Sequence, residues 1–261
     1  MGSRIAALLL RYLYLYRRSV ARVMAIVFWP VMDLLVWGFV TAYLQRIEVP
    51  GPVLFLLGGV IFWDVFYSSS QAITLSITEE IWGRNILNLF VAPIRVSELM
   101  LATCLLGALR ALASTALLSL LAWIFYAFRL TSVGFALAPF LASLLLFGWA
   151  VGMCTMALIL RYGQAAEALI WGVPFLIQPL SAVFYPLSVL PAPLQSIARL
   201  LPTTHVFEGM REALKTGSVD SAILLRAFAL NVAALLLASL FFAWMLGRVR
   251  EKGYLGRLGM E

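Results

Sequence analysis

Three charged residues, Asp33, Asp64 and Arg110, lie inside long apolar stretches of the sequence. Each lies about 10 to 12 residues into its stretch, which is about 15–18 Å deep in a helix that crosses a membrane. An unpaired charge at that depth costs at least about 2–3 kcal/mol, so each side chain must face protein or water. They could line a polar route or relay protons, or they could form an ion-pair cluster that braces the first three spans. We favour the structural cluster.

A second polar group, His205, Glu208 and Arg211, follows a proline-rich stretch. It could form an outward-facing hydrolytic or metal site, but the chain has 1 histidine and no second ligand at a usable spacing. We therefore interpret His205 as a polar anchor at the outer interface. We expect Glu208 and Arg211, three residues apart, to pair or to line the outer mouth of a route. Cys104 and Cys154 lie in apolar segments, so neither a disulfide nor a metal site is expected.

Composition places these residues in a membrane. Hydrophobic residues make up 63% of the 261 residues and charged residues 12%, with a mean hydropathy of +0.98, whereas soluble domains carry about 25% charged residues. The net charge of +7 would suggest nucleic acid for a soluble chain. Arginine and lysine at membrane faces explain it better, because the aromatic residues lie inside apolar runs rather than on a polar surface.

The sequence predicts an all-α integral membrane protein that forms a single transmembrane domain over residues 1–261. Residues 1–22 are expected to form an N-terminal interfacial helix whose basic stripe faces anionic headgroups; the stripe is Arg4, Arg11, Arg18 and Arg22. Six later stretches each exceed the about 20 residues needed to cross the hydrocarbon core. The six predicted spans are 23–44, 52–75, 99–128, 133–160, 165–189 and 222–247. The first is too long for a signal peptide, so it is expected to be retained.

Basic residues assign the orientation of these spans. More of the 19 lysines and arginines fall on the side of the N-terminus than on the other side, and such residues are enriched in cytoplasmic loops. We therefore predict six transmembrane helices with both termini in the cytoplasm.

Residues 78–93, between the second and third predicted spans, form the most polar interruption in the first half of the chain. On a helical projection the polar and apolar residues fall on opposite arcs: Glu80, Arg84, Asn85 and Asn88 on one, and Trp82, Ile86, Leu89 and Phe90 on the other. Glu80 and Arg84 have a favourable spacing for a helical ion pair, and Pro93 is expected to end the helix. Such a helix would lie on the membrane surface, where it can contact a partner.

Residues 190–216 are too apolar for a solvated loop and too rich in proline for a span. They predict a short outer re-entrant hairpin of two helices, the second capped by Thr203 or Thr204.

Glycine, proline and aromatic residues inside the spans suggest how they pack and move. Gly148 and Gly152 form a G-x-x-x-G pattern, for which packing within the chain is the default and dimerisation the alternative. Pro174 and Pro179 are expected to kink the fifth span. Eight aromatic residues could line a route for an amphipathic substrate, although belt or core packing explains most of them: Trp37, Trp63, Phe66, Tyr67, Trp171, Phe175, Phe184 and Tyr185.

Residues 83–94, Gly-Arg-Asn-Ile-Leu-Asn-Leu-Phe-Val-Ala-Pro-Ile, resemble the cytoplasmic coupling segment of ABC exporter permeases of the type-2 family. That family includes drug, lipo-oligosaccharide and polysaccharide export permeases. The outer stretch is similar to theirs as well, with Phe184-Tyr185-Pro186, Leu190-Pro191 and Leu201-Pro202 followed by Glu208 and Arg211. The chain departs from a common family pattern in having Asn88-Leu89-Phe90 where Glu-Leu-Leu is often found. With the N-terminal helix and the six spans, the resemblance covers essentially the whole chain.

The resemblance implies the permease half of an ATP-driven exporter in a bacterial-type inner (plasma) membrane. A second copy of the chain would complete the pathway, and two nucleotide-binding ATPase subunits would dock beneath it. ATP and Mg would bind in that partner, since this chain lacks a G-x-x-x-x-G-K-[ST] phosphate loop; no cofactor and no catalytic residue are expected in the chain itself. The implied ATPase-coupling residues are Glu79, Glu80, Trp82, Gly83, Arg84, Asn85, Leu89, Phe90 and Pro93, with Trp82, Leu89 and Phe90 as the apolar anchor.

The implied cargo is a lipid, a drug or a lipid-linked saccharide moved out of the cytoplasm. Two other function classes stay open. An ion-coupled secondary transporter or channel would use Asp33, Asp64 and Arg110, and would be expected to show internal repeats, which the sequence lacks. A membrane-embedded enzyme would use His205 and Glu208. Neither explains the amphipathic segment before Pro93.

Overall fold

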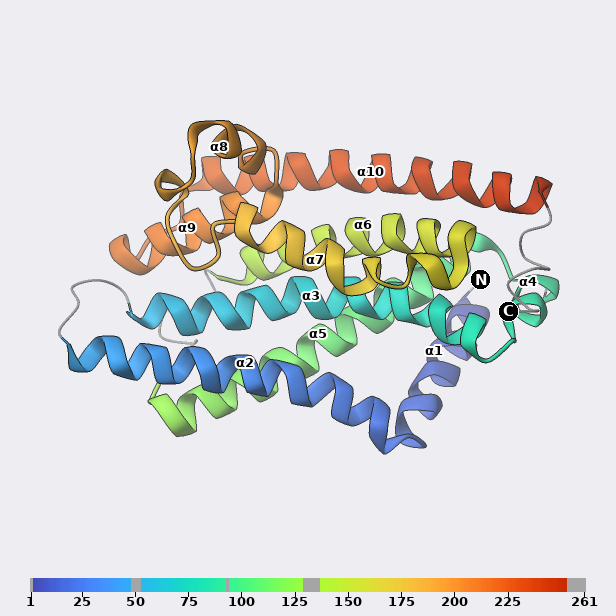
Figure 1. The fold of residues 1–261 in the computed structure, drawn as a ribbon, viewed down its shortest axis with the longest axis horizontal. Coiled ribbons are helices and arrows are strands. Elements are labelled where there is room, and N and C mark those ends of the chain that lie inside the picture. The colour runs from blue at the N-terminus through green and yellow to red at the C-terminus, as the bar shows by residue number, and fades with distance from the viewer. Residues whose placement is uncertain (1, 48–52, 93, 129–136, 253–261) are drawn as a thin grey trace.

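The computed structural model describes residues 2–47, 53–92, 94–128 and 137–252. Every regular element within these residues is a helix (Figure 1). The α-helices are α1 (Gly2–Arg17), α2 (Val20–Arg46), α3 (Val53–Trp82), α4 (Ile86–Val91), α5 (Val96–Tyr126), α6 (Ala138–Tyr162), α7 (Leu169–Leu180), α8 (Ala192–Ala198), α9 (Pro202–Thr216) and α10 (Ser221–Glu251). Two short 3-10 turns, η2 (Gly163–Ala166) and η3 (Leu187–Val189), connect some of them.

Four stretches of the described helices are long and apolar enough to cross a membrane: Arg22–Arg46, Val96–Tyr126, Ala138–Ala166 and Ser221–Glu251. They overlap the first, third, fourth and sixth predicted spans. The second predicted span lies within α3, although residue 52 lies outside the described residues, as do residues 133–136 of the fourth. The fifth predicted span, 165–189, contains an α-helix of only 12 residues, which is too short to cross the hydrocarbon core by itself.

α3 lies in the middle of the molecule, and α2, α5 and α6 pack around it. Two glycines let α6 approach α3 closely. A Cβ atom at Gly148 would lie 2.7 Å from the carbonyl oxygen of Phe66, and one at Gly152 would lie 2.8 Å from the carbonyl oxygen of Ser70. The G-x-x-x-G pattern therefore packs within the chain, as predicted, and it fixes α3 against α6.

α10 packs along the other side of α6. Within this contact the buried Asn231 side chain donates from Nδ2 to the Ser143 hydroxyl at 2.7 Å and to the Ser143 carbonyl at 3.1 Å. Polar side chains that bridge helices in this way stabilise packing where lipid provides no hydrophobic driving force.

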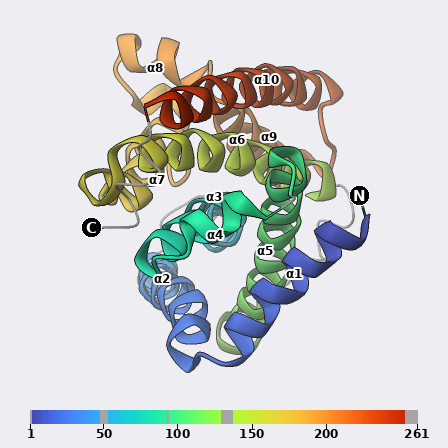
Figure 2. The same ribbon diagram turned by 90° about the vertical axis from the view of Figure 1, so that its right-hand side faces the viewer.

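The two ends of the molecule differ in character. One end, called the polar end here, holds α1, α4 and the last turns of α10, and the opposite end holds the α8–α9 hairpin. Figure 2 looks onto the polar end, where α1 lies beside α5. The chain turns from α1 into α2 at Ser19, whose hydroxyl accepts a hydrogen bond from the N–H of Arg22 at 3.4 Å. This turn brings the arginines of α1 and α2 to the end of α3.

Candidate functional site

α3 ends at the polar end in a backbone motif that stops the helix. The N–H of Arg84 donates to the carbonyl of Ile81 at 2.9 Å, and the N–H of Asn85 donates to the carbonyl of Glu80 at 2.8 Å. These two bonds define a Schellman motif, which places its central residue in the left-handed conformation; Arg84 has a φ of 52°. The single helix expected over residues 78–93 is therefore interrupted, because this turn satisfies the last carbonyls of α3 before α4 begins.

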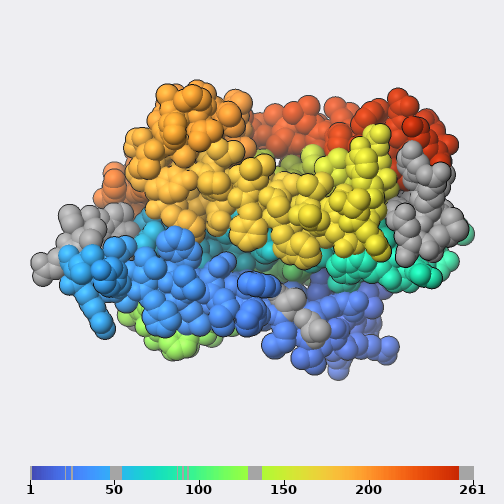
Figure 3. Space-filling model, in the orientation of Figure 1, coloured from blue at the N-terminus to red at the C-terminus, as the bar shows by residue number. Residues whose placement is uncertain are grey.

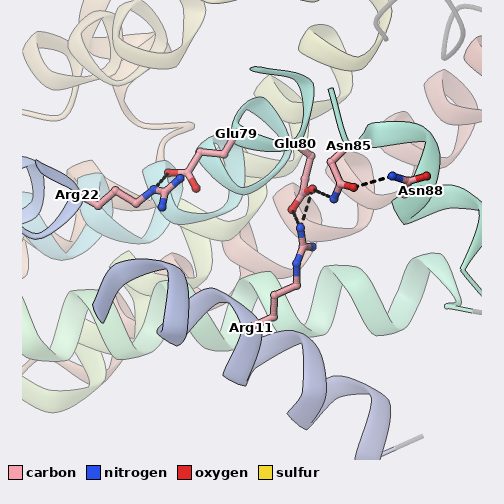
Figure 4. Close-up of polar contacts among 6 residues, drawn as sticks. All are labelled: Arg11, Arg22, Glu79, Glu80, Asn85 and Asn88. Carbon is pink, nitrogen blue, oxygen red and sulfur yellow. Dashed lines mark hydrogen bonds and ion pairs between the residues drawn. The ribbon is translucent and has the colours of Figure 1, made fainter. Parts of the chain in front are cut away.

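Two arginines of the N-terminal helices hold the end of α3 (Figure 4). Arg11 Nη2 lies 2.7 Å from Glu80 Oε1, and Arg22 Nε donates to Glu79 Oε1 at 3.2 Å. Glu80 is only 3% exposed, so its carboxylate depends on Arg11 for charge compensation. The hydrogen bond with Glu80 in turn raises the pKa of Arg11. Glu80 thus pairs with Arg11 rather than with Arg84, the partner expected from helical spacing.

A third ion pair joins α1 to α5. Arg4 Nη1 lies 3.6 Å from Glu98 Oε2, and Glu98 also accepts a hydrogen bond from the N–H of Arg95 at 2.9 Å, at the first turn of α5. Three arginines of the predicted basic stripe, Arg4, Arg11 and Arg22, therefore contact carboxylates of the chain itself. The sequence analysis, which favoured lipid headgroups as the partner of the stripe, did not include these contacts with protein, and Arg18 is exposed.

The outer side of the α3–α4 turn forms a small exposed surface, which we call the α4 patch: Trp82, Gly83, Arg84, Asn88 and Val91. Trp82 is 49% exposed and Val91 is 84% exposed. On the inner side of the same segment, Ile86 and Leu89 are buried in the core. The segment is amphipathic, but its two sides differ from the predicted arcs, because Trp82 is exposed and Glu80 is buried. The exposed side combines apolar, amide and basic groups.

The predicted coupling residues divide between these two sides. Glu79, Glu80 and Asn85 have partners within the chain; the Asn85 amide donates to Glu80 Oε2 at 2.6 Å and accepts a hydrogen bond from Asn88 at 2.9 Å. Of the expected apolar anchor, Trp82 is exposed and Leu89 is buried; the indole N–H of Trp82 donates to Glu167, between η2 and α7. The Phe90 side chain and Pro93 lie outside the described residues.

A cavity of about 410 Å³ between α2, α3 and α7 is the second candidate site. Its lining residues are Trp29, Pro30, Asp33, Val60, Trp63, Asp64, Tyr67, Trp171 and Phe175. On each helix they recur at spacings of three and four residues, which places them on one helical face. A smaller cavity adjoins it and shares Asp33, Trp63 and Phe175. Figure 3 shows the face of the molecule on which α2, in blue, and α7, in yellow, lie.

Two of the three charges inside the predicted spans, Asp33 and Asp64, line this cavity. Asp64 is 5% exposed. Its Oδ1 accepts a hydrogen bond from Ser68 at 3.3 Å, whereas no described residue forms a hydrogen bond with its Oδ2. Arg110 does not line the cavity, and its Nη1 donates to the Tyr16 hydroxyl at 3.4 Å. The ion-pair cluster that we favoured from the sequence is not formed within the described part of the chain.

A hydrogen bond from α3 fixes α7, the helix that contributes Trp171 and Phe175 to the cavity. Pro174 has no N–H to donate to the carbonyl of Ile170. Gln71 of α3 donates to that carbonyl instead, at 2.6 Å. The bond ties α7 to α3 beside the cavity and positions Trp171 and Phe175, four residues apart, on one face of α7.

At the hairpin end, Arg211 joins α9 to the segment before it. It pairs with Glu208, as predicted, and donates from Nη2 to the carbonyls of Ala182 at 2.8 Å and Tyr185 at 2.9 Å. Its guanidinium carbon also lies 4.0 Å from the centre of the Phe55 ring. Burial lowers the pKa of Arg211, against the opposing effect of Glu208. Arg211 thus holds α9 to the segment that follows α7 and to α3.

His205 lies on the same hairpin, where its Nε2 is 2.9 Å from the carbonyl oxygen of Arg199. Within the described residues there is no group of three potential metal-ligating side chains from His, Cys, Asp and Glu. The role of His205 as a polar anchor at the outer interface stays a prediction.

Sequence reasoning missed three residues that shape these sites. Gln71 carried no local signal, because its partner carbonyl is 99 positions away. Glu167 was not connected with Trp82, 85 positions away, for the same reason. Trp29 could have been found, because it lies four residues before Asp33 and so shares a helical face with it.

The model of one protein family, described as ABC-2 type transporter, matches residues 4–215 of the chain. The matched region includes the N-terminal helix, both candidate sites and the outer hairpin. No curated protein matches the chain.

Proposed function

Because the chain belongs to the ABC-2 type transporter family, whose membrane component associates with an ATP-binding subunit, we propose that it is the permease of an ATP-driven exporter. The cargo we propose is a lipid, a drug or a lipid-linked saccharide that moves out of the cytoplasm. The observation that carries the proposal is the polar end, where ion pairs cross-link α1, α3 and α5 behind an exposed α4 patch.

The proposed topology has six crossings. α3, of 30 residues, and α7, continued by its flanking turns, would add to the four stretches that are long and apolar enough. The polar end would then lie on the cytoplasmic side of a bacterial-type inner membrane with both termini, and the α8–α9 hairpin would lie on the outer side. The excess of basic residues near the N-terminus supports this orientation.

The ATP-binding subunit would dock on the α4 patch. Trp82 and Val91 offer apolar contact area, and Arg84 and Asn88 offer polar contacts. Glu79 and Glu80 would not touch the partner; they would transmit its movement to α1 and α2 through Arg22 and Arg11. Residues from the end of α3 to the start of α5 would thereby move as one body with the N-terminal helix.

Two copies of the ATP-binding subunit and a second copy of this chain would complete the exporter. ATP and Mg would bind in the partner subunit, and no residue of this chain would take part in hydrolysis. Exposed apolar side chains on α2 and α7, such as Phe39, Tyr43 and Leu176, supply surface for lipid or for the second copy.

The test compares Val91→Asp with Val189→Asp, because both valines are well exposed, at 84% and 65%, and lie at opposite ends of the molecule. The tagged chain is purified from its native membrane, bound ATP-binding subunit is detected by photolabelling with azido-ATP, and ATP hydrolysis is measured. Wild type and Val189→Asp are expected to retain the labelled subunit and the activity, and Val91→Asp to lose both. Retention of both by Val91→Asp would contradict docking at the α4 patch.

A second candidate function, ion-coupled transport, rests on Asp33 and Asp64 facing one cavity with no ion-pair partner among the described residues. It predicts that the chain alone, in proteoliposomes without ATP, transports when a proton gradient is applied, and that Asp33→Asn abolishes this transport. The exporter predicts no such transport by the chain alone.

A further inference from the structure

The cavity between α2, α3 and α7 brings together two kinds of group that attract positive charge. Carboxylates of Asp33 and Asp64 line it, and most of its remaining lining is aromatic, including Trp63, Tyr67 and Trp171. Aromatic faces attract cations through the negative charge of their π systems, and tryptophan does so best. The cavity volume of about 410 Å³ falls in the range of sites for small organic ligands.

No ion pair of the described residues reaches the carboxylates of the cavity, and the charge of Arg110 acts on Asp64 only at longer range. Asp64 is 5% exposed, and its Oδ2 has no hydrogen-bond partner among the described residues. The ion pairs of the described residues are formed by Arg4, Arg11, Arg22 and Arg211 with glutamates, so none of them reaches Asp33 or Asp64. A carboxylate at membrane depth is costly unless it is paired or faces water. A positively charged ligand would provide the missing partner.

Arg110 is the one basic residue that the sequence placed at the same depth. Its Nη1 donates to the hydroxyl of Tyr16 on α1, and its guanidinium carbon lies 5.8 Å from the centre of the Tyr16 ring. It does not line the cavity, so it leaves the space in front of Asp33 to a ligand.

The cavity is also open to a ligand from outside. Trp29, Trp171 and Phe175 are all exposed, and they lie at its rim on α2 and α7. These rings provide an apolar entrance beside the two carboxylates. Such an entrance suits a molecule with an apolar body and one charged group better than it suits a hydrated metal ion, which needs several oxygen ligands.

We propose that this cavity binds an organic cation, a protonated amine or a quaternary ammonium group carried on an apolar body. Asp33 would face the charge, Asp64 would add negative potential from behind, and Trp63, Trp171 and Tyr67 would surround the cationic group. The inference rests on the proposed export function for its role, since it narrows the cargo to cationic amphiphiles. Binding itself requires no partner subunit.

The test uses two probes of the same shape that differ in charge. Benzyltrimethylammonium carries a quaternary ammonium group, and neopentylbenzene is its neutral carbon isostere. Binding of each to the purified full chain in phosphatidylcholine nanodiscs is measured by equilibrium dialysis, with empty nanodiscs subtracted. Wild type is expected to bind the cation about tenfold or more tightly than the isostere. Asp33→Asn and Trp171→Leu are each expected to reduce that preference by about fivefold or more.

Two matched controls separate loss of the site from general damage. Asp220→Asn makes the same chemical change at the N-cap of α10, where Asp220 accepts from the N–H of Ala222 at 2.8 Å and asparagine caps as well. Trp123→Leu removes a tryptophan that is 50% exposed, close to the 46% of Trp171, and does not line the cavity. Both controls are expected to keep the wild-type preference.

Two results would overturn the inference: equal binding of the two probes by wild type, or an unchanged preference in Asp33→Asn. Because no ATP-binding subunit is present, this outcome is distinct from failure of the exporter proposal. If wild type shows no preference for the cation but the ATP-binding subunit still docks at the α4 patch, only the proposed cargo class is rejected. Cation preference in a chain that binds no ATP-binding subunit rejects only the export function.

Discussion

The same helices hold two pairs of carboxylates in opposite ways. At the polar end, Glu79 and Glu80 at the end of α3 are each bonded to an arginine of the N-terminal helices. About four turns earlier on the same helix, Asp64 shares a cavity with Asp33, and neither forms an ion pair within the part of the chain that the structure describes. Burial does not explain the difference, because Glu80 and Asp64 are 3% and 5% exposed.

The difference separates two uses of charge in a membrane protein. A buried pair whose partners come from distant segments fixes those segments to one another. A buried carboxylate without a partner is destabilising, so a site that keeps one is a candidate for binding. On this reasoning we expect the polar end to move as a unit and the cavity to bind a ligand.

The largest effect on stability is expected from Arg11→Ala. The substitution leaves the buried Glu80 carboxylate without its charged partner, so we expect the free energy of unfolding to fall by about 2–3 kcal/mol. Glu80→Ala should cost less, because Arg11 has 37% of its side chain exposed and can regain water. Denaturant unfolding of the purified chain in nanodiscs measures both. Equal costs for the two variants would mean that burial of Glu80 is not what makes the pair important.

A somewhat smaller loss of stability is expected from Gly148→Ala. This substitution tests how α6 packs against α3, the helix that contributes to both regions. The added methyl group would lie 2.7 Å from the Phe66 carbonyl oxygen of α3, and such overpacking costs about 1–3 kcal/mol. Gly247→Ala is the matched control, because no atom lies within 4 Å of its Cβ position. The same unfolding measurement applies, and a neutral Gly148→Ala would show that α3 and α6 are not held by this contact.

The smallest effect on stability is expected from Asp33→Asn. Because Asp33 has no ion-pair partner among the described residues, the change breaks no ion pair and removes an uncompensated charge, so the free energy of unfolding should not fall. A loss close to that of Arg11→Ala would make Asp33 a structural residue and remove the contrast between the two regions. The unfolding of both variants is best measured side by side in one lipid.

The local patterns of the sequence predicted much of the fold. Apolar length located the four long spans, the Glu208–Arg211 spacing predicted their pair, and Gly148 and Gly152 predicted close packing. These features depend on residues three or four apart, or on composition over about 20 residues. The amphipathic character of residues 78–93 was also readable, although the break at Arg84 was not, because arginine rarely adopts the left-handed conformation.

The pairing of charges could not be predicted in the same way. Arg11 is 69 positions from Glu80 and Arg22 is 57 positions from Glu79, so only the folded arrangement brings them together. Helical spacing offered Arg84 as the partner of Glu80, and membrane depth offered Arg110 as the partner of the aspartates. In the folded structure Glu80 pairs with Arg11 instead, and Arg110 donates to Tyr16.

The most direct test of a permease driven through its polar end is a charge swap at Arg11 and Glu80. ATP hydrolysis by the purified complex with its ATP-binding subunit is measured for Glu80→Arg and for the double variant Arg11→Glu with Glu80→Arg. We expect the single variant, which places two cations together, to lower permease-stimulated hydrolysis by about fivefold or more, and the double variant to restore it. Full stimulation in a folded Glu80→Arg variant would contradict coupling through this pair.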